Sequence, residues 1–222
     1  MEQGMEEGFW QSRWQEGRIG FHEGRPNALL EKHFDVWGLE PGAHVFVPLC
    51  GKAFDLDWLL AKGLRVSGIE FNRQAVEEVF ARLGLTPEVE QSDGLIRFHA
   101  DGLTLYSGDF FALEASDLGP VDAVYDRAAL VAIAPERRQG YADHLAALTG
   151  RARQLLVGFN YDQSAMQGPP FSIPEAIIRG LYAEKFDSAL LESAPVDGPM
   201  AQRVDAQEEI WLLTPLAEGQ RT

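Results

Sequence analysis

Four charged side chains stand where predicted strands end, and such positions often bind a ligand. Glu70 closes the predicted strand "RVSGIE", and Asp109 follows the extended run "LYSG". Asp126 and Arg127 interrupt an otherwise apolar stretch, "VYDRAALVAI". The carboxyl ends of parallel strands meet at one edge of a sheet, where α/β proteins hold their ligands. We therefore expect a binding site at this edge.

The segment "HVFVPLCGKAF" has the position of a phosphate-binding loop but not its residues. A P-loop ends in Gly-Lys followed by a hydroxyl residue, and Ala53 stands in that last place. A dinucleotide fingerprint needs three glycines, and Leu49, Gly51 and Phe54 occupy the three places. The side chains of Leu49 and Phe54 would block the close approach of a pyrophosphate. The loop is therefore poorly suited to phosphate.

The position of Glu70 points to a nucleoside instead. It lies 19 residues after Gly51, and the ribose-binding acid of a mononucleotide unit is expected after about 20. A carboxylate there can accept hydrogen bonds from both ribose hydroxyls. A site that binds a nucleoside without a pyrophosphate fits S-adenosylmethionine. The alternative is that Glu70 only caps the following helix.

The next two strand ends add residues that suit such a cofactor. Asp109 can accept a hydrogen bond from an adenine amino group, and Phe110 can cover the ring face; alternatively, residues 107–109 form only a turn. Arg127 can bind the carboxylate of the cofactor or an anionic acceptor. Alternatively, Asp126 and Arg127 pair with each other or cap the next helix.

Composition excludes several classes of function. The formal net charge is −15, from 34 acidic and 19 basic residues, and no basic patch for nucleic acid is present. No apolar run approaches the roughly 20 residues of a membrane span, and the acidic N-terminus does not resemble a secretory signal. The single cysteine, Cys50, fits a reducing compartment, and the five histidines lack metal-ligand spacing. We expect a cytoplasmic protein without metal, nucleic-acid or membrane partners.

Strand-like and helix-like segments alternate from His44 onward, which is typical of an α/β fold. Asp101-Gly102 indicates a hairpin turn between two extended runs. Residues 1–40 lie outside the alternation, and we expect them to cover the site, with Trp10 and Trp14 on one helical face; the alternative is a helix that only packs on the core. Strands are expected at 44–49, 65–70, 96–100, 103–107, 121–126, 153–161, 186–192 and 208–214, and helices at 53–63, 73–84, 135–150 and 174–185.

Taken together, these stretches resemble the bacterial branch of the thiopurine S-methyltransferase family. The matching segments, in family order, are "FWQSRWQEGRIGFH" with Asn27, "VPLCGKAFDLDWLLAKG" with "GIE", "GDFFAL", "VDAVYDRAALVAI" and "GPPFSI". The resemblance implies a Rossmann-like sheet of seven mostly parallel strands, with helices on both faces, an antiparallel last strand and an N-terminal helical cover. It also implies one domain, residues 1–222, that uses S-adenosylmethionine to methylate sulfur.

The resemblance also assigns site residues. Contacts with the cofactor fall on seven residues: Trp14, Leu49, Glu70, Gly108, Asp109, Phe110 and Arg127. Phe21 matches a residue that lines the substrate pocket, and His22 beside it either contacts the pocket or has a structural role. Tyr161 and Phe171 lie in the region expected around the acceptor. No catalytic base is assigned, because acidic heteroaryl thiols supply their own thiolate; Arg127 is the candidate for orienting an anionic acceptor.

The expected reaction is methylation of a small thiol, such as a heteroaryl thiol or thiopurine, or of a reduced selenium or tellurium compound. A monomer with a role in detoxification is expected. One alternative is a protein that binds S-adenosylmethionine as a sensor without catalysis. Another is a nicotinamide-dependent oxidoreductase on a similar fold, against which the missing loop glycines argue.

Overall fold

The strands form one sheet in the computed structural model, which describes residue 12 and residues 24–92 and 94–217. Across these residues the sheet has nine strands in the order β3-β4-β5-β2-β1-β6-β7-β9-β8. Their bounds are β1 His44–Val47, β2 Arg65–Glu70, β3 Glu88–Ser92, β4 Leu95–Ala100, β5 Leu103–Ser107, β6 Ala123–Arg127, β7 Arg153–Tyr161, β8 Phe186–Pro195 and β9 Ala206–Pro215.

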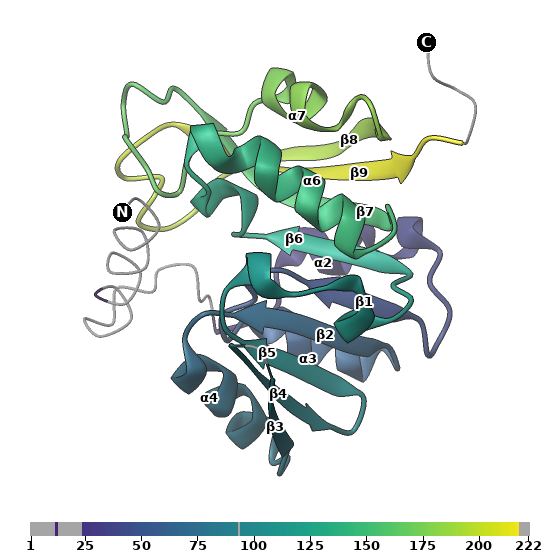
Figure 1. Ribbon diagram of the computed structural model, residues 1–222. Helices are drawn as coiled ribbons and strands as arrows, with labels where there is room; N and C mark the ends of the chain where they lie inside the picture. Colours follow the sequence, from purple (N-terminus) through teal and green to yellow (C-terminus); the bar gives the residue numbers. More distant parts are fainter. Residues whose placement is uncertain (1–11, 13–23, 93, 218–222) are drawn as a thin grey trace.

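The central strands of this sheet run parallel. β1 pairs with β2 and β6, β2 pairs with β5, and β6 pairs with β7, all in parallel. β9 is antiparallel to both β7 and β8, so the arrowheads of β6 and β9 point in opposite directions in Figure 1. This confirms the predicted mostly parallel sheet with an antiparallel last strand, because the seven strands from β5 to β8 have that arrangement.

Two strands lie beyond the seven that the family resemblance implies: β4, which was expected at residues 96–100, and β3, which was not expected. The hairpin expected at Asp101-Gly102 joins β4 and β5, and β3 pairs antiparallel with β4 at the edge. All five residues of β3 are exposed. Because no face of β3 is buried, its sequence lacks the alternation of apolar and polar residues that predicts a strand.

Helices cover both faces of the sheet (Figure 1). One core cluster joins the sheet to α6 and α7, and the other joins it to α2, α3 and α4. None of the helices in the described part of the chain is both long enough and apolar enough to cross a membrane. The α-helices are α2 Ala28–His33, α3 Phe54–Ala61, α4 Arg73–Leu83, α5 Ala115–Leu118, α6 Arg138–Leu148 and α7 Glu175–Tyr182; 3₁₀ turns occupy Phe34–Trp37, Phe110–Ala112, Leu130–Ala132 and Pro135–Arg137.

The loop after β1 packs against β2 without room for one extra carbon. A Cβ atom on Gly68 would lie 2.9 Å from both the Cys50 Sγ and the Val47 carbonyl oxygen. Cys50 is 4% exposed, and burial raises the pKa of its thiol well above the usual value. Cys50 is therefore a packing residue of the core, with no thiolate for covalent chemistry.

We expect Gly68→Ala to lower the free energy of unfolding by about 1–3 kcal/mol, because the backbone of Val47 must move to admit the methyl group. Urea denaturation measures the change. Gly140→Ala is the matched control: Gly140 lies in α6, and a Cβ there meets nothing within 4 Å. That substitution should stabilise the helix by about 0.5–1 kcal/mol. If Gly68→Ala left the free energy of unfolding unchanged, the packing at this position would not be as tight as described.

Candidate functional site

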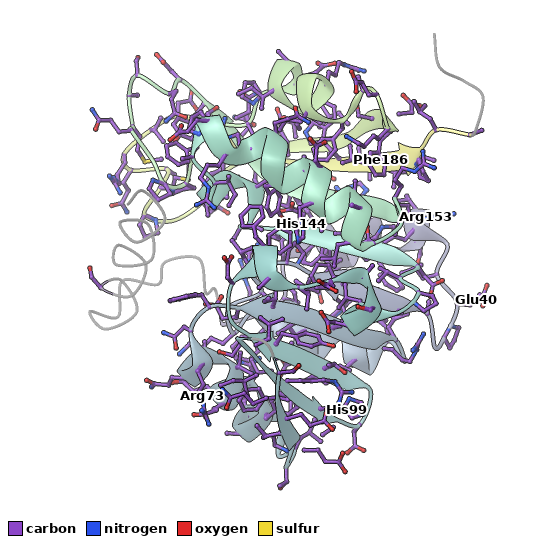
Figure 2. All side chains as sticks on the ribbon, viewed as in Figure 1. Glu40, Arg73, His99, His144, Arg153 and Phe186 are labelled. Atoms are coloured by element: carbon purple, nitrogen blue, oxygen red, sulfur yellow. The ribbon has the colours of Figure 1, made fainter. Side chains whose placement is uncertain are left out.

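Those predicted site residues that the structure describes gather at the carboxyl ends of the parallel strands. β2 ends at Glu70 and β6 ends at Arg127, and the arrowheads of both strands point to the left in Figure 1. Glu40 and Arg153, which precede β1 and begin β7, lie at the opposite side of the molecule in Figure 2. The strand order reverses at β1, between β2 and β6, and α/β folds bind ligands at such a switch point.

The loop after β1 curls across the end of β2. Leu49 and Gly51 both adopt left-handed backbone conformations, with φ of 44° and 53°. The N–H of Cys50 donates to the carbonyl oxygen of Ile69 at 2.9 Å, which fastens the loop to the neighbouring strand. This conformation directs the N–H of Gly51 at the carboxylate of Glu70. The loop therefore uses a backbone N–H group, that of Gly51, to hold the Glu70 carboxylate.

Glu70 is held in a fixed orientation by backbone N–H groups. Its Oε1 accepts a hydrogen bond from the Asn72 N–H at 2.7 Å, and its Oε2 accepts one from the Gly51 N–H at 3.0 Å. Burial raises the pKa of Glu70 to about 7, although the backbone hydrogen bonds oppose the rise. Each carboxylate oxygen has a second lone pair. The group can thus accept two further hydrogen bonds, which fits the two hydroxyls of a ribose.

The pKa of Glu70 predicts that nucleoside binding depends on pH. Only the ionised carboxylate accepts from both hydroxyls, and the protonated form grows as the pH falls below about 7. The dissociation constant of S-adenosylhomocysteine should therefore be about tenfold larger at pH 6 than at pH 8. Calorimetric titration across this range measures it. In Glu70→Gln the dependence should disappear; a wild-type affinity independent of pH would contradict the prediction.

The end of β5 lies beside Glu70, and Asp109 follows directly after it. The N–H of Gly108 donates to the Glu70 carbonyl oxygen at 3.1 Å. Gly108 has φ of 153°, and a Cβ there would lie 2.5 Å from Cδ2 of Leu95. Glycine is therefore required at this position by packing as well as by backbone conformation. Asp109 Oδ1 accepts a hydrogen bond from the Phe111 N–H at 3.0 Å, which fixes the turn after the strand.

Phe110 lies in the core, with 6% of its surface exposed. Its ring centroid is 5.1 Å from that of Tyr141 and 4.9 Å from that of His144, whose Nε2 is 3.2 Å from the Phe110 carbonyl oxygen. The Phe110 ring thus packs against two rings of α6. The next residue, Phe111, is only partly buried, and the guanidinium of Arg137 lies 5.2 Å from its ring centroid.

Asp126 and Arg127 have separate partners. Asp126 is fully buried, and it accepts hydrogen bonds from the Tyr141 hydroxyl at 2.8 Å and the Leu130 N–H at 3.1 Å. Burial raises the pKa of Asp126 to about 6, and these two hydrogen bonds oppose the rise. Asp126 therefore caps the turn that begins at Leu130, as one alternative predicted. The other alternative, a pair between Asp126 and Arg127, is replaced by an ion pair of Arg127 with Asp55.

No sequence pattern predicted this role of Asp55. Its Oδ2 lies 3.5 Å from Nη1 of Arg127, and its side chain is 1% exposed. Its Oδ1 accepts the Asn27 N–H at 2.7 Å, so the pair also fixes the start of α2. An acid in the first turn of a helix, as Asp55 is in α3, is usually explained by the helix dipole. Only the fold brings it beside Arg127.

Tyr161 and Phe171 lie together at the end of β7. The Tyr161 hydroxyl donates to the Pro170 carbonyl oxygen at 2.6 Å and accepts from Gln163 Nε2 at 3.1 Å. The Phe171 N–H donates to the Val131 carbonyl oxygen at 2.7 Å. The hydroxyl proton of Tyr161 is thus already engaged in a hydrogen bond within the loop. Its side chain, which is 8% exposed, can only line the site.

Three predicted site residues, Trp14, Phe21 and His22, lie outside the described residues, so their roles stay predictions. Within residues 24–92 and 94–217, no group of three or more His, Cys, Asp and Glu side chains is arranged to hold a metal ion.

Known proteins resemble this chain over nearly its full length. The family model described as thiopurine S-methyltransferase matches residues 5–214. The thiopurine S-methyltransferase of Xanthobacter autotrophicus is 53% identical over 210 residues, which cover 94% of this chain and 99% of that protein. The thiopurine S-methyltransferase of Gluconobacter oxydans is 42% identical over 208 residues, with 94% of each chain covered.

Solved structures with low sequence identity share the fold. Magnesium protoporphyrin IX methyltransferase from Synechocystis, with bound SAH, is 16% identical with a TM-score of 0.63. The match covers 96% of this chain and 100% of that one. The 1,6-didemethyltoxoflavin-N1-methyltransferase of Burkholderia thailandensis, with bound S-adenosylhomocysteine, is 18% identical with a TM-score of 0.60, and the match covers 93% of this chain and 86% of that one.

Proposed function

The chain belongs to the thiopurine S-methyltransferase family of S-adenosylmethionine-dependent methyltransferases, and from this premise we propose that it methylates the sulfur of a small aromatic thiol. The main support for a cofactor site is the arrangement of Glu70. Two backbone N–H groups hold its carboxylate, and lone pairs remain on the carboxylate for the hydroxyls of a ribose.

The remaining cofactor contacts follow from the neighbouring strand ends. Asp109 directly follows the end of β5 beside Glu70, where it can accept a hydrogen bond from the adenine amino group. Phe111 keeps exposed ring surface at this position, so we assign the adenine cover to it in place of the Phe110 ring, while the backbone at Gly108 and Phe110 borders the base. Arg127, from the far side of the switch point, is the cation for the cofactor carboxylate.

The acceptor side is aromatic. Phe171 is partly exposed above the end of β7, and Tyr161 supports the loop beneath it. Such rings suit a flat, polarizable acceptor that carries sulfur. Heteroaryl thiols and thiopurines have this shape; reduced selenium or tellurium compounds share the soft nucleophilic atom. The same proposal includes a cytoplasmic monomer with a role in detoxification, and Phe21 and His22 as further walls of the pocket.

The protein contributes positioning more than acid–base chemistry. S-adenosylmethionine supplies a methyl group that its sulfonium already activates. The aromatic residues then have to hold the acceptor sulfur in line with that methyl group, and alignment can supply a large share of the rate. Glu70 and Asp126 already accept hydrogen bonds from the protein at both carboxylate oxygens. We assign no catalytic base, because an acidic aryl thiol ionises in solution.

A matched pair of acceptors tests the proposal at neutral pH: a heteroaryl thiol and its amino analogue, with labelled S-adenosylmethionine. The thiol should be methylated at least about tenfold faster, because an acidic aryl thiol is largely ionised at neutral pH and its thiolate is a much stronger nucleophile than the neutral amine. Glu70→Ala serves as a control for turnover that depends on the cofactor site. Faster methylation of the amine would overturn the thiol assignment.

A further inference from the structure

Arg138 is a buried cation that the proposed function does not use. It is the first residue of α6 and is 4% exposed. Its Nε donates to the carbonyl oxygen of Ile133 at 3.2 Å. Its Nη2 is also buried, yet it has no hydrogen-bond partner. A buried N–H without a partner is costly and rare, so this atom calls for a partner that the protein itself does not supply.

The guanidinium lies between the two loops that border the acceptor side. Its Cζ is 5.4 Å from the ring centroid of Phe171, in the loop after β7. Phe171 is tied in turn to Val131, in the loop after β6, by the hydrogen bond from its N–H. Arg138 therefore lies beside the ring that we assign to the acceptor.

Neighbouring groups compensate this charge only in part. Burial lowers the pKa of Arg138, and the negative charge of Glu136 opposes that change. Glu136 is exposed to solvent, and the Tyr161 hydroxyl is engaged with Pro170 and Gln163. Neither side chain donates or accepts a hydrogen bond at the buried Nη2.

We propose that Arg138 recognises a negative charge on the methyl acceptor and so determines which thiols the enzyme prefers; this rests on the proposed function. A guanidinium binds oxyanions through its planar N–H groups and stacks on aromatic rings at the same time. The Phe171 ring provides a surface for the aromatic part of the acceptor, and Nη2 provides the donor for its charge. That charge is either a carboxylate on the ring or the thiolate sulfur. Arg138 itself forms no covalent bond and moves no proton.

Two acceptors distinguish the two charges: 2-mercaptobenzoate, which carries a carboxylate, and thiophenol, which does not. We measure kcat/KM for both with the wild-type protein, Arg138→Met and Arg138→Lys. If the carboxylate is recognised, Arg138→Met should lower kcat/KM for 2-mercaptobenzoate by about 10- to 100-fold, mainly through KM, and that for thiophenol much less. If the thiolate is recognised, both values should fall, and the pH at which the rate is half-maximal should rise. Arg138→Lys should recover part of either loss.

The matched control is Arg179→Gln, which removes an exposed arginine of α7 that pairs with Glu175. This substitution should leave kcat/KM unchanged for both acceptors. Thermal unfolding and affinity for S-adenosylhomocysteine are measured for every variant. If Arg138→Met does not fold, Arg138→Lys is compared with the wild-type protein instead. Unchanged kcat/KM for both thiols without Arg138, or a loss that only follows the loss of cofactor affinity, would overturn the proposal.

A binding measurement separates this proposal from the proposed function. Titration of 2-mercaptobenzoate into the complex with S-adenosylhomocysteine needs no turnover. If the wild-type protein methylates neither thiol, the thiol function fails. Weaker binding of 2-mercaptobenzoate to Arg138→Met would still support the anion site, and equal binding to both proteins would overturn it.

Discussion

Glu70→Ala should weaken the binding of S-adenosylhomocysteine by about 30- to 1000-fold while the protein stays folded. The substitution removes a carboxylate that can accept two hydroxyl groups, and two charge-assisted hydrogen bonds contribute roughly 2–4 kcal/mol. The fold should survive because the Glu70 side chain bonds only to loop N–H groups, while the pairing of β2 with β1 and β5 uses the backbone. Calorimetric titration measures the affinity, and thermal unfolding checks the fold.

The loss must be assigned to the ribose, because the same substitution also releases the N–H of Gly51. A 2′-deoxy analogue of S-adenosylhomocysteine makes this distinction. The wild-type protein should bind the analogue more weakly than the parent compound, whereas Glu70→Ala should bind the two about equally. If the variant still discriminates between them, the acid does not contact the 2′-hydroxyl. Unchanged affinity of Glu70→Ala for the parent would remove Glu70 from the site.

Arg127→Met should lower the free energy of unfolding by about 3–5 kcal/mol. The reason is the partner left behind: the Asp55 side chain is 1% exposed, and a buried carboxylate that loses its cation is strongly destabilising. Asp55→Asn alone should cost less, because its amide can still accept the Asn27 N–H and carries no charge. Urea denaturation of the two single variants and the double variant gives the coupling of the pair.

The double variant also separates the structural role of Arg127 from its proposed contact with the cofactor. Asp55→Asn with Arg127→Met should recover much of the stability lost in Arg127→Met. It should not recover the affinity for S-adenosylhomocysteine, if Arg127 binds the carboxylate of the cofactor. Recovery of both stability and affinity would show that Arg127 acts only through Asp55. Additive losses in stability would mean that the two side chains do not interact.

Much of the fold and part of the site could be predicted from the order of the residues alone. Apolar segments that end in glycine or proline predicted most of the strands and helices. Asp101-Gly102 predicted the hairpin between β4 and β5. The spacing from Gly51 to Glu70 gave the acid at the end of β2. These features are local, since a strand, its turn and the residue that ends it are adjacent in the chain.

The tertiary structure decided which of these residues have partners. Whether the ring of Phe110 or that of Phe111 enters the core depends on α6, which lies far along the chain. The pairing of Arg127 with Asp55 depends on how β6 and α3 meet, and the buried Nη2 of Arg138 depends on the loop after β7. Hydrophobic periodicity encodes which segments are buried. The partner of a buried charge is set by contacts between segments, because desolvation and pairing depend on distance in space and not along the sequence.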